Sequence, residues 1–194
     1  MDHKKYRALV IGGSAGSLDA LLRLFAVVTS CRLPILICVH LHPKDEGGLA
    51  GFFGSKTKMP VKEVIDKQSI ENGTIHISPA NYHLLVERDC TLSLSVDRKV
   101  NFSRPSIDVL FDSAAAAWGE DLIGIILTGA SVDGAAGVHS IKQFGGLTIA
   151  QDPGEAEHPF MPSAAIATGS VDKILTITEI AEFLLAFSDR TGRQ

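Results

Sequence analysis

The feature that most constrains the fold of this chain is a set of short apolar runs that are continuous rather than alternating. Continuous runs rich in Val, Ile and Leu are typical of parallel strands that helices cover on both faces. The clearest runs cover residues 6–11 (YRALVI), 34–39 (PILICV) and 122–127 (LIGIIL). Segments of helical character lie between and after them, at residues 17–28, 105–119, 133–144 and 178–187. The alternation of strand and helix predicts an α/β fold.

The middle of the chain has a different pattern. Between residues 61 and 96, four short pieces (VKEVI, TIHIS, HLLVE and TLSLSV) are separated by turn residues, which predicts a short antiparallel excursion. Farther on, the 133–144 helix ends at Gly145-Gly146 and the strand LTIA follows, which adds a β-α-β unit. We therefore expect a single three-layer αβα domain over residues 1–194, with a doubly wound, mainly parallel sheet.

Length, charge and cysteine usage argue against several functional classes. A chain of 194 residues fits one hydrophobic core, and its net charge of −4 argues against nucleic acid as a partner, because nucleic-acid binders concentrate Lys and Arg on one face. No apolar run reaches the roughly 18 residues that span a bilayer, so we expect no membrane insertion and a cytoplasmic location. The three cysteines show no C-x-x-C spacing and predict neither a disulfide framework nor a cysteine zinc site.

In a doubly wound sheet, functional residues gather at the carboxyl ends of the strands. The first such end is the turn in VIGGSAGSLDALLRLF, residues 10–25. A dinucleotide fingerprint would need glycine where the chain has Ser14 and Ser17, so nucleotide binding is the weaker interpretation of this turn. The alternative is that Ser14 is a nucleophile on a sharp bend, with the backbone N–H groups from Ala15 onward directed at an oxyanion. The plain structural alternative is that Ser14 caps the helix.

Two further strand ends carry a histidine and an aspartate. His40 ends the second run in VHLHP, where a general base for Ser14 would stand, and it ranks above His42 two residues later. Zinc ligation by the two histidines would lack a third ligand at a recognisable spacing, so we expect no metal site. Asp133, in LTGASVDGAAG, is either the N-cap of the following helix or a buried carboxylate that accepts the Nδ1 proton of the histidine.

Longer motifs link these residues to a known family. The segments are VIGGSAGS, VHLHP, ISPANYHLLV, RPSIDVLFDSAA, ILTGASVDGAAG and AQDPGEAEHPFMPSAAI. With them, residues 7–187 resemble the catalytic domain of the CheB-type chemotaxis protein-glutamate methylesterases. The resemblance implies a serine esterase whose nucleophile, base and aspartate are Ser14, His40 and Asp133, without a cofactor. It also implies a role in substrate contact or packing for the segment around Met161.

The chain departs from the family pattern in three places. Family members often have Ser-Thr-Gly-Gly where this chain has Ser14-Ala15-Gly16-Ser17, and Thr-Gly-Met-Gly where it has Thr128-Gly129-Ala130-Ser131. Ala15 and Ala130 keep their N–H groups, so a backbone oxyanion hole is still expected there. About six residues precede the first strand, so we expect no receiver domain, no phosphorylation control in cis, and a separate regulatory protein.

The resemblance implies hydrolysis of glutamate γ-methyl esters on the cytoplasmic helices of chemoreceptors, with methanol as the second product, and related members also deamidate glutamine. Two alternatives stay open at this point. One is a carboxylesterase that acts on a protein outside chemotaxis. The other is a catalytically weak or inactive domain that acts as a signalling adaptor.

Several other polar residues fit structural roles better than catalytic ones. His76 and His83 are expected in strands, with His83 in a supporting role. Glu155 and Glu157 are expected on a solvated face. Cys38, inside an apolar run, is expected in the core.

Overall fold

The computed structural model describes residues 6–40 and 48–188, and within them a seven-stranded sheet forms the centre of the molecule. Its strand order is β10-β9-β8-β1-β2-β5-β3, and every neighbouring pair is parallel. The strands of this sheet are β1 (Ala8–Gly13), β2 (Ile35–Val39), β3 (Val61–Glu63), β5 (Ile75–Ile77), β8 (Leu122–Ile126), β9 (Leu147–Gln151) and β10 (Lys173–Leu175).

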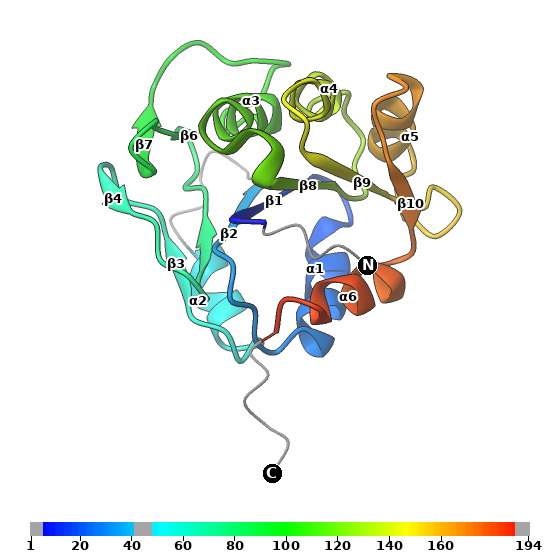
Figure 1. Cartoon of the computed structure of the whole chain (residues 1–194), viewed down its shortest axis with the longest axis horizontal. Coiled ribbons are helices and arrows are strands. Elements are labelled where there is room, and N and C mark those ends of the chain that lie inside the picture. Colours follow the sequence, from blue (N-terminus) through cyan, green and yellow to red (C-terminus); the bar gives the residue numbers. More distant parts are fainter. Residues whose placement is uncertain (1–5, 41–47, 189–194) are drawn as a thin grey trace.

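Helices cover both faces of the sheet, which confirms the expected doubly wound α/β architecture. In Figure 1, α3, α4 and α5 lie on one side of the strands and α1, α2 and α6 on the other. The helices are α1 (Ser17–Val27), α2 (Gly48–Gly54), α3 (Ile107–Trp118), α4 (Ala135–Gln143), α5 (Phe160–Ala167) and α6 (Ile177–Leu185), with a 3₁₀ turn at Gly119–Asp121. None of the described helices is long and apolar enough to cross a membrane.

Successive side chains of β1 point to opposite faces of the sheet, and both faces are covered, which explains the continuous apolar run in its sequence. Leu9 and Ile11 pack into the apolar cluster on the α1 and α6 side, whereas Ala8 and Val10 pack into the cluster on the α3 and α4 side. All four side chains are buried. A strand between two helical layers has no face left for polar residues.

The antiparallel part is smaller than the sequence predicted. It contains β4 (Gln68–Ser69), β6 (His83–Val86) and β7 (Thr91–Ser95), in the order β4-β7-β6. The prediction was wrong for VKEVI and TIHIS, because β3 and β5 join the edge of the parallel sheet. All three residues of β5 are buried, and Ile75 and Ile77 pair with Ile35 and Ile37 of β2. Short strands between turns do not reveal from sequence which sheet they join.

Besides the two-residue β4 and the 3₁₀ turn, three elements had no prediction. The α2 helix is glycine-rich and lacks apolar periodicity, and α5 contains Pro162 in its first turn, where a missing N–H is tolerated. The β10 strand at the sheet edge is largely exposed. The central strands β1, β2 and β8 were predicted to within two residues, and they end side by side at Gly13, Val39 and Ile126.

Candidate active site

The turn after β1 holds Ser14 with its hydroxyl free of any capping role. The Ser14 N–H donates to Thr128 O at 3.0 Å, and the Ser17 hydroxyl donates to Ser14 O at 2.6 Å. The N-cap of α1 is Gly16, in the left-handed region with φ of 77°, and no side chain caps this helix. A left-handed residue here suits glycine. The interpretation of Ser14 as a helix cap is therefore wrong.

His40 lies between Ser14 and Asp133. It follows β2, and its Nδ1 is 3.1 Å from the Ser14 Oγ, while its Nε2 is 2.8 Å from Asp133 Oδ2. The structure therefore brings the three predicted residues into one row. His42 lies outside the described residues.

The imidazole is oriented the opposite way to the prediction, in which Asp133 accepts the Nδ1 proton. The strand order β8-β1-β2 explains the difference. Ser14 follows β1, the direct neighbour of the strand that carries His40, so the ring nitrogen nearer the main chain faces it. Asp133 follows β8, two strands away, and only the distal Nε2 reaches it.

The Asp133 carboxylate is fully buried and lies at the N-terminus of α3. It accepts hydrogen bonds from the Ile107 N–H at 2.7 Å and the Asp108 N–H at 3.2 Å. The Ser106 hydroxyl and the Asn101 amide also donate to it, at 2.8 and 3.0 Å. The predicted N-cap role for the helix that follows it is wrong, because α4 begins at Ala135 with Gly134 as its N-cap. Asp133 instead satisfies the first amides of a different helix.

These contacts set the charge of Asp133. Burial alone would raise its pKa, but hydrogen bonds from His40, Asn101, the Ile107 N–H and Ser106 outweigh burial and lower the pKa to about 2. Hydrogen bonds to the ionised form of a carboxylate favour that form. Asp133 is therefore a carboxylate at neutral pH and can stabilise a protonated His40.

Asp108 makes the reciprocal contacts. Its Oδ1 accepts from the N–H groups of Gly134 and Gly137, at 2.9 and 2.7 Å, in the first turn of α4. Its Oδ2 accepts from the Asn101 amide at 2.7 Å, so Asn101 bridges Asp108 and Asp133. Burial, and then the charge of Asp133, raise the Asp108 pKa above its ordinary value. Asp133, which precedes α4, therefore accepts from amides at the N-terminus of α3. Asp108, in the first turn of α3, accepts from amides at the N-terminus of α4.

The candidate oxyanion donors flank Ser14 on two loops. Of the amides after β8, the Thr128 N–H donates to the Gln151 side chain and the Gly129 N–H donates to His158 O. The N–H groups of Ala15 and Ala130 have no hydrogen-bond acceptor among the described residues. These two amides are available for a substrate oxygen, and their role as an oxyanion hole stays a prediction.

Met161 supports the site from behind. Its side chain is 1% exposed, and its N–H donates to Gly129 O at 2.9 Å. A methyl group added to the Gly129 Cα would lie 2.6 Å from Met161 Sδ and 2.9 Å from Ser14 Cβ. This burial favours packing, the second of the two roles expected for Met161, while substrate contact stays a prediction.

The remaining candidates lie apart from this row. The His83 Nε2 is 3.0 Å from Arg98 O, and His76, in β5, is fully buried. Cys38 is also buried, and burial together with the charges of Asp133 and Asp108 raises the pKa of its thiol well above the ordinary value. The described residues contain no group of three or more His, Cys, Asp or Glu that could hold a metal ion.

The two glutamates before α5 differ from each other. Glu155 pairs with Arg23 and accepts from the Ile177 N–H at 2.7 Å, so it joins α1 to α6. Glu157 is exposed, with its carboxylate 3.4 Å from the His158 ring. The prediction of a solvated face therefore fits Glu157 better than Glu155.

Sequence reasoning missed the residues that hold Asp133. Ser106 and Asp108 belong to RPSIDVLFDSAA, where a serine and an acidic residue at the start of a helix indicate local capping. The pattern does not reveal that the hydrogen bonds at the starts of α3 and α4 join residues 26 positions apart in the sequence. Asn101 has no local signal, because both of its carboxylate partners are brought to it by tertiary folding.

Comparisons with known proteins identify relatives that match nearly the whole chain. A family model described as CheB methylesterase matches residues 9–184. A Leptospira interrogans protein named "Putative protein-glutamate methylesterase/protein-glutamine glutaminase" is 42% identical over 190 residues, which cover 97% of this chain and 98% of that one. Protein-glutamate methylesterase/protein-glutamine glutaminase 2 of Rhodospirillum rubrum is 35% identical over 94% of this chain, which spans about half (51%) of that relative's length. The crystal structure of the Thermotoga maritima CheB methylesterase catalytic domain superposes with a TM-score of 0.88 at 29% identity, over 93% of this chain and 98% of that one.

Proposed function

Since the chain belongs to the CheB methylesterase family of carboxylic ester hydrolases, we propose that it hydrolyses glutamate γ-methyl esters on chemoreceptors. The observation that carries the proposal is the continuous row from the Ser14 hydroxyl through the His40 ring to the buried Asp133 carboxylate. The names of the relatives support the substrate class.

The row supports an acyl-transfer mechanism in two steps. Ser14 Oγ attacks the ester carbonyl while His40 Nδ1 takes its proton, and the developing oxyanion is placed near the N–H groups of Ala15 and Ala130. His40 then delivers the proton to the departing methoxide, which leaves as methanol. Water attacks the acyl-enzyme with the same base, and this releases the glutamate carboxylate and the free serine. Throughout, Asp133 holds the Nε2 proton and stabilises the imidazolium.

The same chemistry extends to a glutamine side chain, with ammonia as the leaving group in place of methanol. The relatives carry this second activity in their names. We place the reaction on the cytoplasmic helices of chemoreceptors, with residues 1–194 acting as one catalytic domain.

The test is a Ser14→Ala variant on methylated receptor membranes, with methanol release as the readout. Loss of the nucleophile should lower kcat by about 10⁶-fold, because the residues of a triad act as a unit. The control is Ser55→Ala, an exposed serine at the end of α2, which should release methanol at the parent rate. Parent-rate methanol release by Ser14→Ala contradicts the proposal.

Two further readouts separate the alternatives. A fluorophosphonate probe should label the parent and not Ser14→Ala, and an unlabelled, folded parent would favour a signalling adaptor instead. A parent that cleaves a nitrophenyl ester but releases no methanol from receptors would favour an esterase with another protein substrate.

A further inference from the structure

A strained two-residue turn lies beside the candidate active site, in the segment between β7 and α3. Val100 and Ser103 close it with two backbone hydrogen bonds of 3.2 and 2.8 Å. Its two corner residues, Asn101 and Phe102, are both in the left-handed region, with φ of 49° and 63°. Turns with two left-handed corners strongly favour Asn-Gly, because a side chain at the second corner is strained. Phenylalanine occupies the glycine position here.

The first corner attaches the turn to the catalytic row. The Asn101 amide donates to Asp133 Oδ1 at 3.0 Å, and the other carboxylate oxygen, Oδ2, contacts His40. A continuous series of hydrogen bonds therefore runs from Ser14 through His40 and Asp133 to the turn. The position of the turn relative to the reacting atoms is fixed by side chains of the site itself.

The second corner has no role inside the fold. The Phe102 side chain is 96% exposed, the highest value among the large exposed apolar residues. Strained residues with large side chains persist where function requires them, because most other sequences would relieve the strain. An exposed aromatic ring beside the residues of a candidate active site is suited to contact with a partner, because aromatic residues are enriched among those that dominate interfaces.

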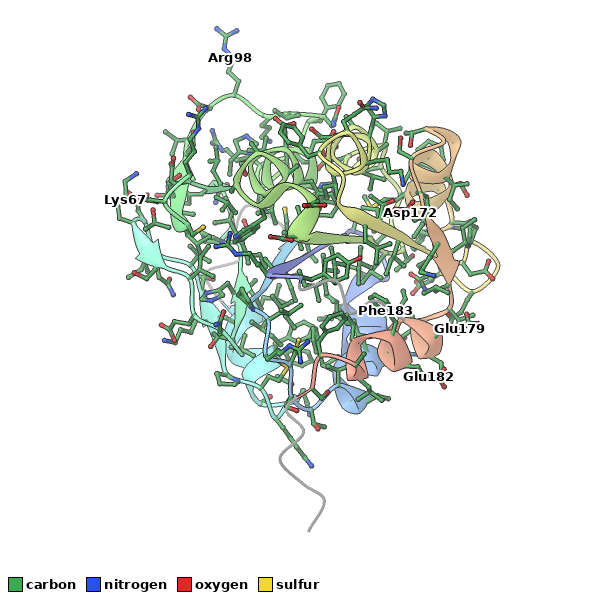
Figure 2. The ribbon with its side chains drawn as sticks, viewed as in Figure 1. Lys67, Arg98, Asp172, Glu179, Glu182 and Phe183 are labelled. Carbon is green, nitrogen blue, oxygen red and sulfur yellow. The ribbon has the colours of Figure 1, made fainter. Side chains whose placement is uncertain are left out.

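Neighbouring residues give this surface a mixed apolar and basic character. Val96 is 67% exposed, and Asp97, Arg98 and Lys99 are also exposed, with the Asp97 carboxylate accepting a hydrogen bond from the Ser95 hydroxyl. Figure 1 shows the segment arching outward beyond α3, and in Figure 2 the Arg98 side chain points away from the body of the molecule. Beside Val100, a cavity of about 280 Å³ between α3 and α4 is lined by Val109, Ala136 and Gly137 together with the acidic residues Asp108 and Asp112. We call residues 96–102 the arm.

We propose that the arm is the docking surface for the substrate helix, with Phe102 against its apolar residues and Arg98 and Lys99 against its glutamates. The inference rests on the proposed function and adds to it the part of the enzyme that selects the protein substrate. The charges are complementary, because each hydrolysis leaves a glutamate carboxylate on the bound segment. The two cations outnumber the single carboxylate of Asp97, so the arm is locally positive on a protein whose net charge is −4.

Phe102→Gly provides the test, because glycine suits the backbone of this turn and removes only the ring. The substrates are an amphipathic helical peptide with one glutamate γ-methyl ester, flanked by leucines and glutamates, and p-nitrophenyl acetate. The KM for the peptide should rise about tenfold or more, as for a residue that dominates an interface. The kcat/KM for p-nitrophenyl acetate should stay within about twofold of the parent, because Asn101 still holds Asp133.

Phe144→Ala is the matched control, since Phe144 is half-exposed and lies at the C-terminal end of α4, away from the arm. It should leave both substrates unaffected. A paired charge reversal compares Lys99→Glu, which should raise the peptide KM several-fold at low salt, with Lys173→Glu on β10, which should not.

The outcomes separate the inference from the proposed function. A parent that does not cleave the peptide ester contradicts the proposed function. A parent that cleaves it with the same KM as Phe102→Gly overturns the docking surface alone. Equal losses on both substrates would also overturn it, because the ring would then be acting on the triad rather than on the protein substrate.

Discussion

At the scale of single residues, the orientation of the His40 ring decides which of its nitrogens can serve the proposed reaction. Its Nδ1 faces Ser14 and its Nε2 faces Asp133, so the proton must reside on Nε2 for Nδ1 to act as a base. The Asp133 carboxylate, with a pKa of about 2, fixes that tautomer over the whole neutral range.

Asp133→Asn should therefore lower kcat by about 10⁴-fold on a nitrophenyl ester. An amide that donates toward Nε2 favours the tautomer with the proton on Nδ1, which cannot accept the serine proton. Asp133→Asn with kcat near that of the parent would mean that the aspartate does not act on His40. Near-ultraviolet circular dichroism of both proteins checks that the variant is folded.

Gly129 is a second residue on which the geometry depends. The methyl group of Gly129→Ala would lie within 3 Å of both Met161 Sδ and Ser14 Cβ, so one of them must move. Met161 is buried, and displacement of Ser14 by a fraction of an ångström lowers kcat. We expect a fall in kcat of about 10²-fold with a smaller effect on the melting temperature. The matched control is Gly51→Ala, where an added methyl meets no atom within 4 Å.

At the scale of elements, α3 and α4 are joined through the two aspartates at their N-termini. Asp133 follows β8 and accepts from the first amides of α3, while Asp108 in α3 accepts from the first amides of α4. A helix N-terminus buried without such acceptors would leave several donors unsatisfied. The pair therefore couples the position of Asp133 to the packing of two helices.

The two aspartates should contribute to stability with opposite pH dependence. The lowered pKa of Asp133 gives about 2 kcal/mol of stability that is complete above its ordinary pKa of 3.8 and is lost as the pH falls through about 2. The raised pKa of Asp108 reduces stability where it is ionised, and this loss is relieved as the pH falls toward 3.8.

Urea unfolding between pH 2 and 7 measures both contributions. Asp133→Asn should flatten the decline in the free energy of unfolding below pH 3.8. Asp108→Asn should make the free energy of unfolding decline more steeply as the pH is lowered toward 3.8. The reason is that the variant lacks the gain in stability that protonation of Asp108 gives in this range. Identical pH profiles for the two variants would show that neither carboxylate is perturbed in this way.

The sequence predicted the features that depend on local patterns and missed those that depend on residues distant in the chain. The strands 6–11, 34–39 and 122–127 and the helices that follow them are local patterns, and they place Ser14, His40 and Asp133 at neighbouring strand ends. The sheet joined by β5, the helix capped by Asp133 and the orientation of the His40 ring depend on partners far away in sequence. Asn101 is in the same class, since its two carboxylate partners come from other elements.

At the scale of the whole molecule, the candidate active site lies at the ends of the most deeply buried strands of the fold. β1 lies between β8 and β2, and its side chains fill both apolar clusters. Strands of this kind open only when the whole domain unfolds.

Loss of activity in urea should therefore coincide with loss of secondary structure. Amide hydrogen exchange should show the N–H groups of Leu9–Ile11 and Ile35–Ile37 with protection close to the global free energy of unfolding. Esterase activity that disappears at a lower urea concentration than the circular dichroism signal would show that the site unfolds separately from the sheet.

The row of three side chains at adjacent strand ends also has a use outside this protein. Neighbouring strands in any sheet are about 4.8 Å apart, so the separation of the nucleophile from its base is set by main-chain pairing rather than by a long loop. The arrangement could be built on a designed parallel sheet by placing an aspartate, a serine and a histidine after three strands that are neighbours in the sheet, with the serine after the middle strand. The remaining task would be to supply amides from a neighbouring helix for the carboxylate, as α3 does here.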